Sequence, residues 1–312
     1  MADPPVPPMS GPTGGRRVGV LGLGAMGSAM AGRLIAAQGL VVGYDPDTEA
    51  VTRLVARGGQ AAATPAACSD GCFVLIVMVR DAAQADEALF GSSGAVRALA
   101  GGSTVWLAST VPPAYAAELE GRLRERGIHC LDGPVSGGVA GAEAGTLTVI
   151  CAGSVQARTA VEPLLPALAQ TVFTVGEQAG AASSAKMINQ MLTATHVALT
   201  AEALTLAMSA GLEPSLLYRI VCASAGNSRM FEARAPRMFG SDIATGPALA
   251  IFRKDLGIAL DEARRLGCPM PISGKAARLF DFAAEHEGAD CPDTVLIRAY
   301  AKLAALPPEE WV

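Results

Sequence analysis

Three side chains in one apolar helical stretch have the chemistry for proton transfer and substrate orientation. Lys186 lies three residues before Asn189 and four before Gln190, so all three project from one helix face. That face is otherwise apolar, which leaves two interpretations of the lysine: its amine extends to solvent, or it is held in a dry pocket. A desolvated amine can act as a general base or acid near neutral pH, and the neighbouring amide would orient a substrate hydroxyl.

The segment DGPVSGG, Asp132 to Gly138, offers a place for an anionic group. It follows the strand-like run IHCLD. Ser136 supplies a hydroxyl, while Gly137 and Gly138 leave their backbone N–H groups unobstructed. Such a turn can hold a carboxylate without a positive side chain, although a Gly-rich segment of this kind more often simply connects two elements.

The segment GLGAMG has the composition of a dinucleotide-binding turn. It follows a strand-like run, opens a helical one, and comprises Gly22, Leu23, Gly24, Ala25, Met26 and Gly27. The first glycine allows a tight turn, the second lets the backbone approach a pyrophosphate, and the third permits close packing of helix on strand. The helix N-terminus adds N–H donors and the positive end of its dipole.

Asp45 ends the second strand-like run, at about the 20-residue distance expected for ribose recognition. A carboxylate there accepts hydrogen bonds from the adenosine ribose hydroxyls and repels a 2′-phosphate, and Pro46 rather than an arginine follows it. The sequence therefore predicts NAD rather than NADP as the cofactor. The competing interpretation is a glycine turn in an α/β fold with an ordinary surface aspartate.

The order of strand-like and helical runs predicts how these segments are held. Up to Val175, runs such as RRVGVLGL, LVVGYD, FVLIVMV, STVWLA and TLTVICAG alternate with Ala- and Leu-rich helical segments, the pattern of βαβ units. Helical patterns then continue to Leu303, beginning with a proline-free stretch from about Gly180 to Gly211. We therefore expect an α/β protein with an N-terminal Rossmann-type doubly wound sheet, followed by an all-α C-terminal domain joined by a long interdomain helix.

The expected domain boundaries follow from the same pattern. Residues 1–15 are Pro- and Gly-rich and are expected to be a disordered tail. Residues 16–176 are expected to form the dinucleotide-binding domain. Residues 177–312 are expected to form an all-helical substrate and oligomerisation domain.

Composition excludes several classes of function. With 51% hydrophobic and 17% charged residues among 312, the chain is long and apolar enough for a substantial core. Its net charge of −5 provides no basic surface for nucleic acid or anionic lipid. Three dispersed histidines and seven cysteines without a CxxC pair predict no metal site, and they indicate reduced thiols in a cytoplasmic protein.

Two stretches lie where an export signal or a membrane helix would be sought: the N-terminus and the apolar 180–210 stretch. The first fifteen residues, MADPPVPPMSGPTGG, lack the apolar core of a signal peptide. The 180–210 stretch is long and apolar, but polar residues argue against a membrane helix: Lys186, Asn189, Gln190, His196 and Glu202. A long apolar helix of this kind instead suggests burial between subunits, so we expect a homo-oligomer, either a dimer or a tetramer.

Taken in order, these segments resemble the β-hydroxyacid dehydrogenases, a family that includes 3-hydroxyisobutyrate dehydrogenase and tartronate semialdehyde reductase. The resemblance runs from Arg16 to about Leu303. It is carried by GLGAMG, by DGPVSGG with the following GTLTV, by the helical phrase KMINQ, and by Lys254-Asp255-Leu256.

The resemblance implies roles for individual residues. Lys186 would be the catalytic lysine, and Asn189 would contact the substrate. The substrate carboxylate would be bound by Ser136, Gly137 and Gly138. The cofactor would be contacted by the GLGAMG turn and Asp45, and further by Val79, Thr110 and Lys254.

Local phrases narrow this resemblance and also depart from it. GNSRMFEARAP and IFRKDLGIALDEAR look most like the L-threonate dehydrogenase branch, whose members oxidise four-carbon sugar acids with NAD. In MVRD, Arg80 follows the apolar pair where the family usually has a proline. It lies near the cofactor or the domain cleft, or it is a solvated loop arginine. Arg229 replaces an aromatic residue expected in that branch, and EHEGADCPDTV is unlike it, so the substrate stays open.

The sequence as a whole favours NAD-dependent oxidation of a small hydroxy acid, such as the four-carbon sugar acid threonate or a three-carbon one, with a lysine general acid/base. One alternative is a reductase of an aldehyde acid of the tartronate semialdehyde type. An imine reductase would share the architecture but generally lacks the lysine and the SGG loop. A non-catalytic dinucleotide-binding scaffold would keep GLGAMG and lose the lysine, so Lys186 with Asn189 favours an enzyme.

Overall fold

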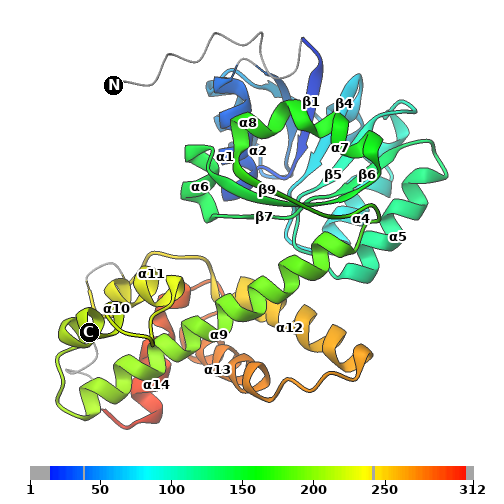
Figure 1. The fold of residues 1–312 in the computed structure, drawn as a ribbon. Coiled ribbons are helices and arrows are strands. Elements are labelled where there is room, and N and C mark those ends of the chain that lie inside the picture. Colours follow the sequence, from blue (N-terminus) through cyan, green and yellow to red (C-terminus); the bar gives the residue numbers. More distant parts are fainter. Residues whose placement is uncertain (1–14, 38, 241–242, 307–312) are drawn as a thin grey trace, which may run out of the picture. The chain divides into compact units, whose positions relative to one another are not determined.

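A computed structural model describes residues 15–37, 39–240 and 243–306 (Figure 1). The chain divides into two units, Met1–Lys186 and Met187–Val312, and the division falls within the long helix α9 (Ala181–Ser209). The first unit is built on a sheet and the second from helices, which confirms the predicted fold class. Of the tail expected at residues 1–15, only Gly15 lies within the described residues.

The first unit contains a nine-stranded, mostly parallel sheet within the described residues. Six strands in the order β3-β2-β1-β4-β5-β6 pair in parallel, which is the strand order of the doubly wound dinucleotide-binding fold. In chain order these strands are β1 (Arg17–Leu21), β2 (Leu40–Tyr44), β3 (Gln60–Ala61), β4 (Cys72–Val77), β5 (Thr104–Leu107) and β6 (His129–Asp132).

Beyond β6 the sheet continues with strands of mixed direction. β8 (Leu147–Gly153) runs antiparallel to both β6 and the short β7 (Val135–Ser136), while β9 (Ala169–Gly176) pairs with β8 in parallel. The chain therefore leaves β6, forms β7 and turns directly into the glycine pair of the SGG segment.

Alternation along the strands divides the core of this unit into two layers. In β4, Val74 and Ile76 pack on one side of the sheet, and Leu75 and Val77 pack on the other, because successive strand side chains point to opposite faces. Helices cover both faces (Figure 1), so such strands are apolar throughout.

The covering helices separate by face. One layer is closed by α1 (Ala25–Ala36), α2 (Thr48–Ala56), α6 (Gly138–Ala144), α7 (Val155–Val161) and α8 (Leu165–Leu168). The other is closed by α3 (Pro65–Ser69), α4 (Ala82–Phe90) and α5 (Pro113–Arg124).

The second unit packs helices around one apolar core. After α9 come α10 (Pro214–Cys222), α11 (Arg229–Met238), α12 (Leu249–Leu266), α13 (Pro271–Glu287) and α14 (Leu296–Leu303). Aromatic rings of α12 and α13 meet in this core, where Phe252 stacks on Phe280 with ring centroids 5.3 Å apart.

α9 is long and apolar on more than one side. Among the described residues it is the one helix that meets the length and hydropathy needed to cross a membrane, and half of that apolar window is buried inside the protein. Its inner side joins the helical core through Val197, Ala201 and Leu204. Such partial burial is what a core helix of a folded domain shows.

Candidate active site

The predicted cofactor residues follow strands that share one edge of the sheet. GLGAMG follows β1, Asp45 follows β2, Val79 follows β4 and Thr110 follows β5. Since these strands are parallel, their carboxyl ends lie at the same edge. The chain crosses over between β1 and β4, and such a switch point at the carboxyl edge is where doubly wound folds bind dinucleotides.

Each glycine of the GLGAMG turn meets a different geometric demand. Gly22 has a φ of +90°, and a Cβ there would lie 2.2 Å from the Met78 carbonyl oxygen. A Cβ on Gly27 would lie 1.9 Å from the carbonyl oxygen of Gly22, so only glycine lets α1 pack this closely on β1. Gly24 faces open space and begins α1 without a side-chain cap, which leaves the first-turn N–H groups of α1 for an anion.

Asp45 is fixed in place by two backbone amides. Its Oδ2 accepts from the Leu23 N–H at 2.7 Å, and its Oδ1 accepts from the Asp47 N–H at 2.8 Å. Each carboxylate oxygen retains further acceptor capacity, and the side chain is half-buried rather than enclosed. The glycine turn and this carboxylate therefore fit the pyrophosphate and the ribose diol of a dinucleotide.

A serine that no sequence motif marks joins the two loops that follow β4 and β5. Ser109 accepts a hydrogen bond from the Val79 N–H at 2.8 Å, and its hydroxyl lies 3.2 Å from the Val77 carbonyl, to which it donates. Val79 and Thr110 are both half-buried beside it. Arg80 is exposed, and its backbone N–H donates to the Gln84 side chain at 3.1 Å, next to the start of α4.

The SGG segment forms a turn from β7 into α6. Ser136 ends β7, Gly137 caps α6 with a φ of +132° and no side-chain cap, and Gly138 opens the helix with a φ of +65°. Both φ values lie in the region that favours glycine. A Cβ on Gly138 would meet nothing within 4 Å, so its backbone is open to approach.

Asp132, at the start of the same segment, joins β6 to α9. Its side chain is fully buried, and its Oδ2 accepts from the backbone N–H groups of Gly180 at 2.8 Å and Ser183 at 2.9 Å. Its Oδ1 accepts from the Ser183 hydroxyl at 2.7 Å. Burial raises the pKa of Asp132, and the hydrogen bonds from Ser183 and Gly180 oppose that rise.

Lys186 lies three residues after Ser183 in α9 and is buried, with 5% of its surface exposed. It belongs to the same unit as the SGG segment. Asn189, by contrast, is exposed and Gln190 is half-buried, so the three polar residues of the KMINQ phrase differ in their surroundings. The sequence pattern placed all three on one helix face, but it could not reveal these differences.

Lys254 and Asp255 lie near the start of α12, in the helical unit. Lys254 is partly exposed and Asp255 is buried, and Nζ of Lys254 lies 3.1 Å from Oδ1 of Asp255. Gln190 of α9 donates to the other oxygen of Asp255 at 2.6 Å. Gln190 of the KMINQ phrase and Asp255 of the KDL phrase are therefore in direct contact within this unit.

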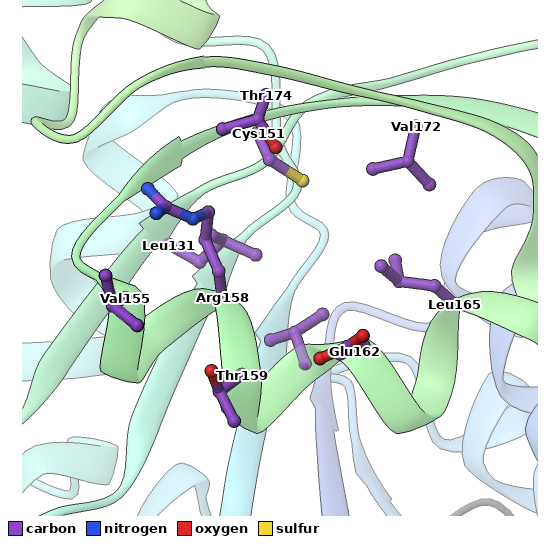
Figure 2. Close-up of a pocket in the computed structure, with 10 residues that line it drawn as sticks. Leu131, Cys151, Val155, Arg158, Thr159, Glu162, Leu165, Val172 and Thr174 are labelled. Atoms are coloured by element: carbon purple, nitrogen blue, oxygen red, sulfur yellow. The ribbon is translucent and has the colours of Figure 1, made fainter.

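A cavity of about 390 Å³ lies in the first unit. Figure 2 shows it between α7 and the strands β8 and β9, lined by Leu131, Cys151, Val155, Arg158, Thr159, Val161, Glu162, Leu165, Val172 and Thr174. None of the predicted site residues lines it.

Comparison with known proteins places the two units in one family. The family model described as the NAD binding domain of 6-phosphogluconate dehydrogenase matches residues 17–176. The model described as the NAD-binding of NADP-dependent 3-hydroxyisobutyrate dehydrogenase matches residues 180–300. An L-threonate dehydrogenase of Cupriavidus necator is 40% identical over 287 residues, which cover 91% of this chain and 96% of that protein. The chain belongs to the β-hydroxyacid dehydrogenase family.

Other β-hydroxyacid dehydrogenases extend this relationship. A crystal structure of 3-hydroxyisobutyrate dehydrogenase from Salmonella typhimurium has a TM-score of 0.84 at 35% identity, covering 91% of this chain and 99% of that one. A 2-hydroxy-3-oxopropionate reductase of Escherichia coli is 29% identical over 290 residues, covering 92% and 98% of the two chains. As a member of the family, the protein is an oxidoreductase that acts on CH–OH groups of small molecules and carries an NAD-binding domain.

Proposed function

We propose that the protein oxidises one hydroxyl of a small hydroxy acid with NAD, and that Lys186 transfers the proton. One observation carries this proposal: Lys186 is buried on α9, and the first turn of α9 is bound by Asp132, the residue that begins the DGPVSGG segment. A buried lysine three residues beyond that anchor is placed for chemistry rather than for solubility.

The substrate carboxylate is proposed to bind at the turn formed by Ser136, Gly137 and Gly138. The two glycines present backbone N–H groups, and the hydroxyl of half-buried Ser136 adds a donor. Asn189 is proposed to contact a hydroxyl of the substrate. Binding the acid by neutral donors suits a chain whose net charge is −5.

In oxidation, a neutral Lys186 accepts the hydroxyl proton, directly or through a water, as the carbon loses its hydride. Bound NAD supplies the hydride acceptor. In reduction the ammonium form of Lys186 returns the proton to the carbonyl oxygen. The buried position of this amine keeps bulk water away from the proton that it exchanges.

The cofactor is proposed to be NAD in preference to NADP. Asp45 would accept hydrogen bonds from the ribose hydroxyls, and its charge would repel a 2′-phosphate. The six residues from Gly22 to Gly27 would hold the pyrophosphate. Further contacts would come from Val79, Thr110 and Lys254.

The substrate is proposed to be a sugar acid of three or four carbons, such as threonate. The Cupriavidus necator relative named L-threonate dehydrogenase supports this choice. The Escherichia coli relative supports the second candidate, reduction of 2-hydroxy-3-oxopropionate, which is tartronate semialdehyde. Arg229 is exposed at the first position of α11, where it replaces an aromatic residue expected in the L-threonate dehydrogenase branch.

The working form is proposed to be a cytoplasmic homo-oligomer, a dimer or a tetramer. α9 exposes a row of large apolar side chains, here called the α9 stripe: Ile188, Leu192, Leu199 and Leu206. Their spacing places them along one helix face. Since 48–70% of each residue is exposed, a second copy of the chain would remove these four apolar side chains from water.

The proposal is tested by kinetics with hydroxy acids and NAD. A panel including L-threonate, D-glycerate and 3-hydroxyisobutyrate identifies the substrate, and 2-hydroxy-3-oxopropionate with NADH tests the second candidate. Lys186→Ala should lower the single-turnover rate by roughly 10²–10⁴-fold, and Lys186→Arg should be nearly as slow because a guanidinium keeps its proton. Lys275→Ala, an exposed lysine of α13, is the matched control. Retention of most of the rate in Lys186→Ala would show that another group transfers the proton, whereas a wild type without any rate would favour the scaffold.

A further inference from the structure

We propose that Asp255 is a positioning residue that fixes, through Gln190, which end of the Asn189 amide meets the substrate. The proposal rests on the proposed function in one respect, the contact between Asn189 and a substrate hydroxyl. All three residues lie in the helical unit, on α9 and α12.

The three side chains form a continuous hydrogen-bonded series. Nδ2 of Asn189 donates to Oε1 of Gln190 at 3.2 Å, and Nε2 of Gln190 donates to Oδ2 of Asp255 at 2.6 Å. The series runs from exposed Asn189 through half-buried Gln190 to Asp255, of which 2% is exposed. It therefore connects the surface of α9 to a buried charge.

The buried charge gives the series a direction. An amide can present either its oxygen or its NH₂ to a neighbour, so two amides in contact have no preferred polarity. A carboxylate has acceptors only, and Asp255 therefore binds the NH₂ end of Gln190. The oxygen of Gln190 is then turned to Asn189, which must present its own NH₂.

This direction determines what Asn189 offers to a ligand. With Nδ2 turned to Gln190, Oδ1 is left as an acceptor that no described residue occupies with a hydrogen bond. An acceptor suits a group that donates, so this position would take a hydroxyl of the substrate and disfavour a second carboxylate. The device would therefore contribute to the choice of hydroxy acids over dicarboxylic acids.

Lys254 compensates the charge that this arrangement buries. Its Nζ lies 3.1 Å from Oδ1 of Asp255, the oxygen that Gln190 does not use. An isolated carboxylate at this depth would be costly, and a neighbouring ammonium offsets that cost. Asp255 thus contacts Lys254, the proposed cofactor ligand, directly. It is connected through Gln190 to Asn189, the proposed substrate ligand.

The test exchanges the polarity of the pair. Asp255→Asn allows the amide of Gln190 to reverse, so the KM for the hydroxy acid should rise about tenfold or more, the usual scale for a lost hydrogen bond to a charged group. The double variant Gln190→Glu with Asp255→Asn restores the direction, because the new amide at position 255 donates to one carboxylate oxygen while the other accepts from Asn189. We expect its KM to lie within about threefold of wild type, by the same reasoning.

A matched control separates positioning from simple loss of an ion pair. Asp281→Asn removes the exposed pair of Arg253 with Asp281, which are 2.7 Å apart on the neighbouring helices α12 and α13. It should leave the KM unchanged. Urea midpoints provide a readout independent of turnover: each single exchange, Gln190→Glu or Asp255→Asn, should lower the midpoint, and the double exchange should recover it.

Two results would overturn the proposal: a wild-type KM in Asp255→Asn, or a folded double variant that is no better than either single variant. If Asp255→Asn fails to fold, Gln190→Glu and the double variant still form a decisive comparison. Failure of the proposed function gives a different result, because the wild type then oxidises no hydroxy acid. The urea midpoints of the single and double variants still show whether the side chains at positions 190 and 255 are coupled.

Discussion

The Asp132 carboxylate and Ser183 are joined by two hydrogen bonds, one from the serine hydroxyl at 2.7 Å and one from its backbone N–H at 2.9 Å. Asp132 ends β6, and Ser183 lies in the first turn of α9. The pair therefore fixes the start of the helix that carries Lys186 relative to the strand that leads into Ser136. A small error at this junction would move Lys186 relative to the turn at Ser136, which is the proposed site of the substrate carboxylate.

Replacing Asp132 should impair both folding and turnover. Asp132→Ala removes the acceptor of the buried Ser183 hydroxyl and N–H and of the half-buried Gly180 N–H, which should cost about 2–5 kcal/mol of stability. Displacement of the helix by about 1 Å is expected to lower kcat by about 100-fold. Asp132→Asn can keep all three hydrogen bonds, since its oxygen accepts from both N–H groups and its NH₂ donates to the serine oxygen. Urea unfolding and kcat should therefore rank wild type and Asp132→Asn together, well above Asp132→Ala; equal loss in both variants would contradict this role.

Stability should depend on pH through the same carboxyl. Burial raises the pKa of Asp132 above 3.8, so the folded protein binds this proton more tightly than the unfolded chain does. The resulting stabilisation is complete below 3.8 and is lost as pH rises through the raised folded value. The free energy of unfolding of wild type minus that of Asp132→Asn should therefore increase as the pH is lowered from neutral toward 3.8. Urea titrations at several pH values measure this difference. A difference that stays constant or decreases as the pH is lowered would contradict a raised pKa for Asp132 in the folded protein.

A third prediction concerns Trp106 and Gly133, the second residue of the DGPVSGG segment. The fully buried indole donates to the Gly133 carbonyl at 2.7 Å, and a Cβ on Gly133 would lie 2.3 Å from the indole nitrogen. Gly133→Ala should therefore destabilise the protein by about 1–3 kcal/mol, the usual cost of overpacking. Trp106→Phe in the same chain should recover part of that loss by removing the obstructing ring atoms. Gly101→Ala, where a Cβ would meet nothing within 4 Å, is the control, and equal thermal midpoints for the two glycine variants would contradict the prediction.

The cofactor preference can be tested at Asp45. Asp45→Ala removes the proposed ribose acceptor and the charge that repels a 2′-phosphate, so kcat/KM should fall with NAD and the NAD/NADP ratio should narrow by about tenfold or more. Asp47→Asn removes a neighbouring exposed charge and keeps an oxygen that can accept from the Glu49 N–H at the start of α2, so its ratio should be close to that of wild type. Steady-state kinetics with both cofactors measure the ratio. A wild-type enzyme that prefers NADP would show the assignment to be wrong.

The sequence predicted those features that repeat a local rule. Apolar runs separated by helical segments predicted the parallel sheet. A parallel strand such as β4 is covered by helices on both faces, so its whole run is apolar. The proline-free stretch after Gly180 predicted α9 closely, since its ends are marked by glycines. The need for glycine at position 27 was also evident, because a Cβ there would meet the carbonyl oxygen of Gly22 within the same turn, whereas the contact that restricts Gly22 is with Met78 on another loop.

Contacts between distant segments were not predictable in this way. Asp132 stood in the DGPVSGG phrase with no stated role, since its partners are 48 and 51 residues away. Asp255 was noted only as part of KDL, and its contact with Gln190 spans 65 residues. No sequence pattern marks Ser109 or Trp106. Each forms a hydrogen bond with the backbone of a distant segment, Val79 for the serine and Gly133 for the tryptophan, which only folding brings beside it.

The α9 stripe supports a last prediction, about assembly. Leu199 and Leu206 lie seven residues apart on one face of α9 and are 50% and 70% exposed, so a monomer gains little from them. If a second copy covers this face, Leu199→Glu with Leu206→Glu would bury two carboxylates in an apolar contact, and the assembly should dissociate. The fold should persist, because exposed positions of a monomer tolerate such changes within about 0.5 kcal/mol each. Leu266→Glu, at a residue 62% exposed at the end of α12, should leave the assembly intact. Sedimentation velocity of the three proteins decides the matter: a monomeric wild type, or an unchanged mass in the double variant, would remove α9 as the interface.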